Sequence, residues 1–164
     1  MALAPPVTNI DEIKAPELER LRAWRADAIE GARLDRNELT ITMRREAIRE
    51  ACELLRQSPE LKFNFLSDLT CVDRHPLEPR FEIIYHLLSH ARKQRLRLKV
   101  KLGGGDATLE SITPVWPAAN YFEREIFDLF GVRFLGHPNL RRLLMPDNWD
   151  GHPLRKDYPV EGYR

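Results

Sequence analysis

Apolar residues recur at helical spacing in two stretches of the first sixty residues. Pro16 begins the first stretch, Gly31 follows it, and its apolar positions are Leu18, Leu21, Trp24 and Ala28. The second stretch ends at Ser58 and Pro59, and its apolar stripe consists of Ile48, Ala51, Cys52 and Leu55. Both stripes place their side chains on one face of a helix, and proline and glycine favour the ends. We therefore predict one helix from Pro16 to just before Gly31 and a second that ends at Ser58.

Four other segments follow the pattern of β-strands. Residues 38–43 alternate polar and apolar after the turn-prone residues 35–37, and strand-like runs cover residues 61–72, 81–88 and 95–102. In the last run four Lys/Arg residues alternate without a fault with Leu or Val. This alternation predicts one buried and one cationic face, and the short links between the runs favour antiparallel pairing.

A third helix is expected at residues 118–130, with Gly131 ending it. Together these elements predict an α+β fold, a two-layer sandwich of a mostly antiparallel sheet with helices. Beyond Phe134, prolines recur every six to eight residues and leave no room for a sustained helix or a central strand. We predict an N-terminal lead (residues 1–14), an α+β domain (15–134) and an extended, irregular C-terminal tail (135–164).

Length and composition limit the function classes. A chain of 164 residues suits one domain with a tail, and the near balance of 26 Lys+Arg against 25 Asp+Glu favours neither a nucleic-acid binder nor an acidic, solvating chain. The longest stretch without a charged side chain, residues 111–122, contains two prolines and is too short to span a membrane. The N-terminus resembles neither a secretory signal nor a mitochondrial presequence, so we expect a bacterial-type cytoplasmic location.

The residues usually used for catalysis or metal binding form no recognisable constellation. Cys52 and Cys71 lack metal-ligand spacing, and we expect both to be buried free thiols. His75, His137 and His152 each precede a proline, which favours a role in turns over metal binding. We therefore expect no catalytic, cofactor-binding or metal site in this chain.

Neither the cationic strand face nor the glycine run is strong evidence for a site that binds nucleic acid or phosphate. Arg95, Arg97, Lys99 and Lys101 have no aromatic residues between them, unlike sheets that stack nucleic-acid bases. A solvated face, or an edge strand protected by its charges, is the simpler interpretation, with contact to an acidic protein surface as the other. The three glycines at 103–105 lack the spacing of a phosphate-binding loop, and we interpret them as a turn.

The helix at 118–130 by itself is consistent with an ordinary amphipathic helix. Phe122, Ile126, Leu129 and Phe130 would form its core stripe, and Arg124 and Asp128, one turn apart, could pair in solvent. The tail after it is more distinctive, because Gly-His-Pro occurs at Gly136 and again at Gly151, each time followed by a leucine and two cations.

These segments carry a resemblance to a known family. The sequences Glu123-Arg-Glu-Ile-Phe-Asp128, Leu144-Met-Pro-Asp147 and the two Gly-His-Pro turns resemble the signature of the 30 kDa subunit of proton-pumping NADH:quinone oxidoreductase, respiratory complex I, called the C subunit in bacteria. The resemblance is dense over residues 111–164, and the preceding order of elements is also similar. In length we expect a departure from some relatives, which carry a longer C-terminal extension or a fused 49 kDa subunit.

The resemblance implies a scaffold subunit without catalytic residues in the hydrophilic arm of the complex, peripheral to the cytoplasmic side of the bacterial inner membrane. It implies binding to the 49 kDa subunit (the D subunit) near the B and I subunits, with FMN, iron–sulfur clusters, NADH and quinone held by other subunits. The signature residues, which we expect to bind the partner, are Glu123, Arg124, Glu125, Asp128, Gly131, His137, Pro138, Arg141, Arg142, Met145, Pro146, Trp149, His152, Pro153, Arg155, Lys156, Asp157 and Tyr158.

For the tail we expect a binding arm in which Arg141, Arg142, Arg155 and Lys156 reach carboxylates or carbonyls of another subunit. The alternative is a tail that packs on its own domain. For the whole chain, the alternatives are the equivalent subunit of a membrane-bound energy-converting hydrogenase or related dehydrogenase and, more remotely, an RNA-binding α+β module.

Overall fold

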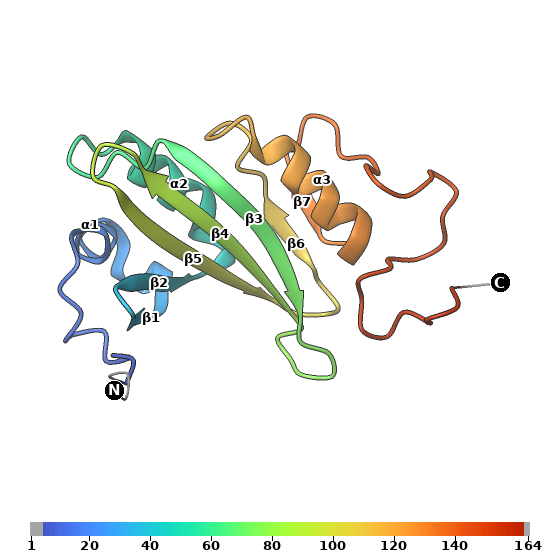
Figure 1. The fold of residues 1–164 in the computed structure, drawn as a ribbon, viewed down its shortest axis with the longest axis horizontal. Helices are drawn as coiled ribbons and strands as arrows, with labels where there is room; N and C mark the ends of the chain where they lie inside the picture. Colours follow the sequence, from blue (N-terminus) through green and yellow to red (C-terminus); the bar gives the residue numbers. More distant parts are fainter. Residues whose placement is uncertain (1–4, 163–164) are drawn as a thin grey trace.

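The computed structural model describes residues 5–162, so the first part of the N-terminal lead and the last two residues of the tail lie outside the described residues. Within the described residues the fold has three α-helices and seven strands (Figure 1). The helices are α1 (Pro16–Arg25), α2 (Ile48–Gln57) and α3 (Ala119–Phe130). The strands are β1 (Ile29–Asp35), β2 (Glu38–Met43), β3 (Phe65–Asp73), β4 (Phe81–Ser89), β5 (Gln94–Leu102), β6 (Thr108–Glu110) and β7 (Arg133–Leu135).

Five strands form the main sheet in the order β1-β2-β5-β4-β3. Three of the four neighbouring pairs are antiparallel, and only β2 and β5 run parallel. The parallel pair arises because α2, β3 and β4 intervene between the two strands in the chain. The predicted α+β fold with a mostly antiparallel sheet is therefore confirmed.

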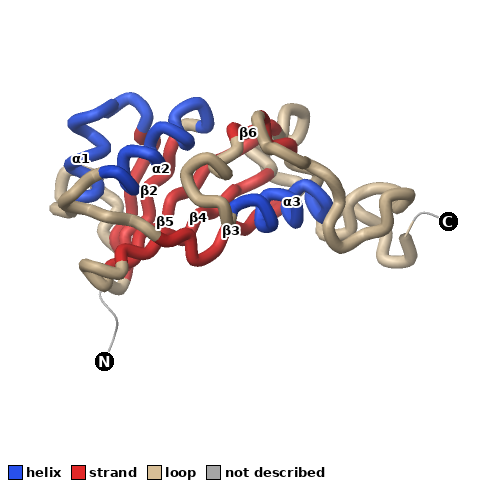
Figure 2. The backbone as a smooth tube through the Cα atoms, turned by 90° about the horizontal axis from the view of Figure 1, so that it is seen from above, coloured by secondary structure: helices blue, strands red, loops and turns tan. Residues whose placement is uncertain are grey.

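The hydrophobic core lies between this sheet and the helices. Along β4, buried residues alternate with half-buried ones over all nine positions, as a strand with one face on the core requires. The core face of β5 carries Leu96, Leu98, Val100 and Leu102, all nearly inaccessible to solvent. Figure 2 shows α1 and α2 on the same side of the sheet, while Figure 1 shows α3 running alongside β3. The predicted helix stripe of α2 is also buried.

The first helix is shorter than predicted, because α1 ends at Arg25 and a further strand begins at Ile29. β1 pairs with β2 through a two-residue turn in which Arg36 and Asn37 have positive φ angles of 52° and 65°. That turn is the kind that joins twisted antiparallel strands. The predicted helix was too long because Ala28 falls at helical spacing, although this residue belongs to a short 3₁₀ turn, Ala26–Ala28.

Two other differences concern short segments. β3 begins at Phe65 rather than at Leu61, because Lys62 has a positive φ of 50° and the chain turns there while Leu61 and Phe63 enter the core. β6 and β7, three residues each, pair in parallel and were not predicted. Strands this short carry too few alternating positions to give a pattern.

The predicted buried state of both cysteines is confirmed, and neither forms a disulfide. Over residues 5–162, no helix is long and apolar enough to cross a membrane. From residue 136 to 162 the chain forms no helix or strand and follows an irregular path beyond α3 (Figure 1). The contacts of this tail with α3 define the site described next.

Candidate partner-binding site

Asp128, in the last turn of α3, is a fully buried carboxylate to which the tail is fastened. Its Oδ2 accepts hydrogen bonds from the backbone N–H groups of Leu143, Leu144 and Met145 at 2.7–3.0 Å. Its Oδ1 lies 2.7 Å from Nη1 of Arg142. Burial by itself would raise the pKa of Asp128, but these four donors outweigh burial and hold the pKa below its ordinary value. Asp128 is thus an ionised anchor for residues 142–145.

The last carbonyl groups of α3 are also satisfied by the tail. His152 Nδ1 lies 2.8 Å from the Asp128 carbonyl oxygen, the Leu154 N–H donates to Leu129 at 3.0 Å, and Arg155 Nε donates to Phe130 at 2.6 Å. These are groups that an α-helix leaves without internal partners. The second Gly-His-Pro-Leu-Arg segment therefore caps the C-terminus of α3.

Gly131 makes this cap sterically feasible. Its φ of 75° is left-handed, and a Cβ at this position would lie 2.5 Å from Nη2 of Arg155 and from Nε2 of His152. The predicted end of the helix at Gly131 is confirmed.

The two Gly-His-Pro turns contact opposite ends of α3. Gly136 and Gly151 share a φ of 76°, and the following histidine in each turn faces a carbonyl of the helix. His137 Nε2 lies 3.2 Å from the Asn120 oxygen in the first turn, while His152 contacts the last turn. Burial is the main reason that the pKa of both imidazoles lies below its ordinary value. The repeat thus holds the two ends of one helix, in keeping with the expected role of these histidines in turns.

Two arginines organise the backbone of the tail. Arg124 donates to the carbonyls of Arg141 and Arg142 at 3.2 and 3.0 Å. Arg142 Nη2 donates to the carbonyls of Trp149 and Gly151 at 2.9 and 3.1 Å. The expected pair between Arg124 and Asp128 is therefore wrong: Asp128 pairs with Arg142, because the tail covers the helix face that the sequence pattern assigned to solvent.

A second anchor joins the tail to the sheet. The Arg80 guanidinium contacts the buried Asp73 through Nε and Nη2 at 3.0 and 2.8 Å, and it contacts Asp157 of the tail at 2.6 and 2.9 Å. The Lys156 N–H also donates to Asp73, at 2.9 Å. Although burial acts to raise the pKa of Asp73, Arg80 and the backbone donors lower it. Sequence reasoning missed Asp73 and Arg80, because their partner lies more than seventy residues away.

Glu123 is fully buried one turn before Asp128, but it serves a different loop. It accepts hydrogen bonds from Ser111 Oγ at 2.6 Å and from the Ile112 N–H at 2.7 Å. Burial raises the pKa of Glu123 to about 7. His137 lies 4.0 Å away, with Nδ1 accepting the Asn139 N–H, so its other nitrogen carries the proton and faces Asn120. The expected core stripe of the helix is therefore only partly correct, because Glu123 and Asp128 are buried as well, while Phe122 and Phe130 are only half-buried.

The remaining predicted residues lie mainly on the outer side of the tail. Pro138, Arg141, Pro146, Trp149 and Lys156 are exposed, as is Glu125 on α3, whereas Met145, Pro153 and Tyr158 are half-buried. Trp149, Pro153 and Tyr158 line a shallow hollow of about 390 Å³. The Arg141 and Lys156 side chains make no hydrogen bond or ion pair within residues 5–162. For Arg142 and Arg155, the expectation of partners on another subunit is wrong, since both are engaged within the chain.

Four large apolar side chains of the tail are also exposed to solvent. The exposed fraction is 60% for Leu144, 39% for Trp149 and 52% for Leu154, and Val160 is fully exposed. At Leu144 and Leu154 the backbone N–H anchors the tail, while the side chain remains exposed. We call these four residues, together with Arg141 and Lys156, the outer face of the tail, because exposed apolar and cationic side chains of this kind suit contact with another protein.

Comparisons with known proteins match the chain to one family. Residues 41–164 match the family model described as the respiratory-chain NADH dehydrogenase 30 kDa subunit. The C subunit of the NADH-quinone oxidoreductase of Roseiflexus sp. (strain RS-1) is 50% identical over 146 residues, which are 89% of this chain and 84% of that protein. The corresponding C subunit of Geobacter sulfurreducens is 44% identical over 144 residues, covering 87% of this chain and 88% of that protein.

Two solved structures share the fold. A trypsin-resistant fragment (1–134) of Nqo5 matches with a TM-score of 0.63 and 31% identity, covering 76% of this chain and 99% of the fragment. A chain of the membrane-bound sulfane sulfur reductase, an archaeal respiratory membrane complex, matches with a TM-score of 0.72 over 88% of this chain and 85% of its own length. At 24% identity, the second match shows the fold alone. The resemblance noted in the sequence is confirmed, and the chain belongs to the family of the 30 kDa subunit of the respiratory-chain NADH dehydrogenase, complex I.

Proposed function

We propose that this chain is a non-catalytic scaffold subunit of the peripheral arm of respiratory complex I, in which electrons pass from NADH to quinone and protons are translocated. In this proposal the tail binds the 49 kDa subunit (the D subunit), with the B and I subunits nearby, on the cytoplasmic side of the bacterial inner membrane. The names of the relatives, which are subunits of NADH-quinone oxidoreductases, support membership of such a complex. Association with the membrane would then be through the other subunits.

The observation that carries the proposal is the fixed tail with an apolar outer face. Asp128 and Asp73 hold its backbone, so the tail does not have to be ordered when it docks. Preorganisation of this kind removes part of the entropy loss that weakens binding by flexible segments. The exposed Leu144, Trp149 and Leu154 are the kind of side chains that a partner surface buries.

The chain itself is proposed to carry no flavin, iron–sulfur cluster or quinone. In residues 5–162 there is no group of three or more His, Cys, Asp or Glu residues that could hold a metal ion. Burial raises the pKa of both cysteine thiols, which disfavours the thiolate form that binds iron. Stoichiometric iron or flavin in the carefully purified chain would contradict this part of the proposal.

Affinity purification of the tagged chain from its native membrane tests the assembly role. We expect a 49 kDa-type subunit to copurify in stoichiometric amount with the wild-type chain and to be lost with Leu144→Asp. Leu77→Asp is the matched control, because Leu77 is a leucine of similar exposure, 66%, that lies in the β3–β4 turn rather than in the tail. Each variant should keep the urea unfolding midpoint of the wild type. Retention of the partner by Leu144→Asp would show that the tail is not the contact.

A second candidate is the equivalent subunit of a membrane-bound energy-converting hydrogenase or related dehydrogenase. The fold shared with a chain of an archaeal respiratory membrane complex supports this second candidate. The same purification separates the two, because hydrogenase-type or sulfur-reducing partners in place of NADH-oxidising ones would identify the second candidate.

A further inference from the structure

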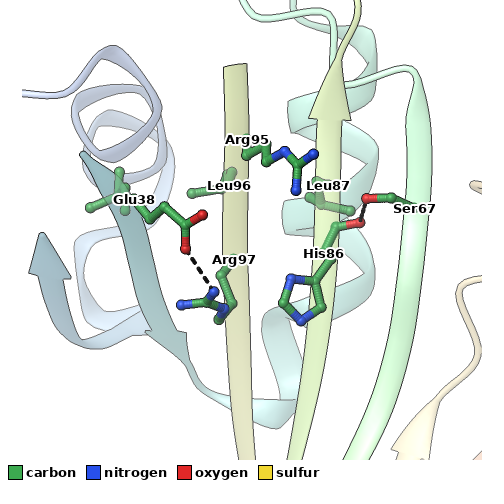
Figure 3. Close-up of a pocket in the computed structure, with 8 residues that line it drawn as sticks. Glu38, Ser67, His86, Leu87, Arg95, Leu96 and Arg97 are labelled. Carbon is green, nitrogen blue, oxygen red and sulfur yellow. Dashed lines mark hydrogen bonds and ion pairs between the residues drawn. The ribbon is translucent and has the colours of Figure 1, made fainter. Parts of the chain in front are cut away.

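A small hollow of about 130 Å³ lies on the sheet face opposite the core (Figure 3). It sits over β5 between β2 and β4, and its polar lining comes from Glu38, Ser67, His86, Arg95 and Arg97. Arg95, Arg97 and His86 occupy the strand positions that alternate with the buried residues of β5 and β4. The backbone beneath them is engaged in strand pairing, so only side chains can bind a ligand there.

The size of the hollow limits its occupant. Pockets for cofactors and drug-sized ligands have volumes of about 300–1,000 Å³. A hollow of about 130 Å³ on an open face suits the end of one side chain rather than a nucleotide or a flavin.

The charges of the hollow are only partly neutralised within the chain. Glu38 lies 2.9 Å from Arg97, which also donates to Thr40 Oγ1 at 3.1 Å. Arg95 and the His86 ring make no hydrogen bond or ion pair with any residue from 5 to 162. Burial and then Arg97 lower the pKa of His86, with Arg95 acting in the same direction and Asp68 and Glu38 opposing. The unsatisfied positive group in the hollow is therefore Arg95.

An exposed aromatic residue lies in the same cross-strand row. Phe65 on β3 is opposite Leu88 on β4, and Leu88 is opposite Arg95 on β5. Phe65 is 45% exposed and packs edge-on against His90 at 5.3 Å between ring centres. Arginine and aromatic residues placed together are enriched at the energetic centres of protein interfaces.

We propose that this hollow and Phe65 form a second docking surface, distinct from the tail, which receives an acidic side chain of a neighbouring subunit of the complex with its carboxylate paired to Arg95. A carboxylate matches both the planar guanidinium and a neutral imidazole that donates one hydrogen bond. The proposal rests on the proposed function, because it requires neighbouring subunits. Its occupant is a protein, since the apolar row beside Arg95 contributes nothing to the binding of a free anion.

Arginine labelling in the assembled complex tests the contact without any mutation. Phenylglyoxal modification of Arg95, measured by mass spectrometry, should be several-fold slower in the complex than in the isolated chain. Arg44 is the reference within the same chain, because it is exposed, makes no ion pair with any residue from 5 to 162 and lies at the opposite end of β2 from the hollow. Equal labelling of Arg95 in both states would overturn the proposal.

Charge reversal then tests its contribution to assembly. Arg95→Glu should lower the fraction of tagged chain found in the complex about tenfold, as expected for a contacting charge pair, whereas Arg95→Lys and Arg44→Glu should lower it little. If wild type and Arg95→Glu assemble equally, only this inference fails; if the wild type has no partner subunits, the proposed function fails as well. Protection of Arg95 in a self-associated isolated chain, or on anionic lipid vesicles, would identify another occupant and overturn the proposal.

Discussion

Replacing Asp128 with asparagine should uncouple the tail from α3 at little change in volume. The asparagine oxygen could still accept the N–H groups of residues 143–145, but its NH₂ group would then face Nη1 of Arg142, which is also a donor. If the amide turned round, Arg142 would regain an acceptor and three backbone donors would lose theirs. Neither orientation satisfies all four donors that the carboxylate binds in the wild type.

The expected loss follows from burial. Removing one partner of a buried ion pair lowers stability by about 3–5 kcal/mol. Arg142 is 15% exposed and keeps its bonds to the carbonyls of Trp149 and Gly151, so the lower end of that range applies. We predict that Asp128→Asn lowers the free energy of unfolding by about 3 kcal/mol.

Urea unfolding of the isolated chain at pH 7, followed by tryptophan fluorescence, measures this loss, with an unchanged denaturant slope as the sign that the same surface is exposed. Asp147→Asn is the matched control, because Asp147 is an exposed tail carboxylate with no hydrogen bond or ion pair to another residue from 5 to 162. Its replacement should change the free energy of unfolding by no more than about 0.5 kcal/mol. A loss below about 1 kcal/mol for Asp128→Asn, comparable to a single ordinary hydrogen bond, would refute the proposed anchoring role.

Three other substitutions test the Ser111 loop, the end of α3 and the anchor at Asp73. Burial raises the pKa of Glu123 from its ordinary 4.5 to about 7, so its contribution to stability is present below pH 4.5 and lost as the pH rises through 7. Glu123→Gln should remove this loss of stability with rising pH, which amounts to at most about 3 kcal/mol. If the free energy of unfolding of both proteins changed in parallel between pH 4.5 and 8, the prediction would be contradicted. Gly131→Ala should lose at least about 1–2 kcal/mol in urea unfolding because of the left-handed φ, and a neutral result would mean that the backbone relaxes at no cost. Arg80→Ala should lose about 3–5 kcal/mol by leaving Asp73 buried without its cation, and a loss under 1 kcal/mol would show that Lys156 and water satisfy Asp73.

Elements with many repeats of their own pattern could be predicted from the sequence. β5 alternates over the eight residues 95–102 and α2 has a four-residue apolar stripe, and both were found where expected. β1 has a weaker signal, because Gly31 and the exposed Arg33 interrupt its apolar residues. Its existence depends on pairing with β2, which is a tertiary effect that local spacing does not record.

Only part of the candidate site could be predicted from the sequence. The repeated Gly-His-Pro turns identified the tail as unusual, and the glycine angles and histidine contacts now explain both copies. The burial of Asp128 could not be predicted, because its donors lie fourteen or more residues further along an irregular segment. A helical pattern assigns a charged position to solvent unless the segment that covers it also has a pattern.

The two buried carboxylates of α3 differ in how far hydrogen-bond donors offset the effect of burial on their pKa. Glu123 receives two hydrogen bonds, both from uncharged groups, and its pKa rises to about 7. Asp128 receives three backbone N–H groups and a guanidinium, and its pKa falls below its ordinary value. The tail is therefore held by a carboxylate that stays ionised throughout the neutral range, while the loop at Ser111 is held by one that gains or loses a proton there. Because the outer face of the tail depends on Asp128 and not on Glu123, its geometry should persist across neutral pH, as a constitutive scaffold requires.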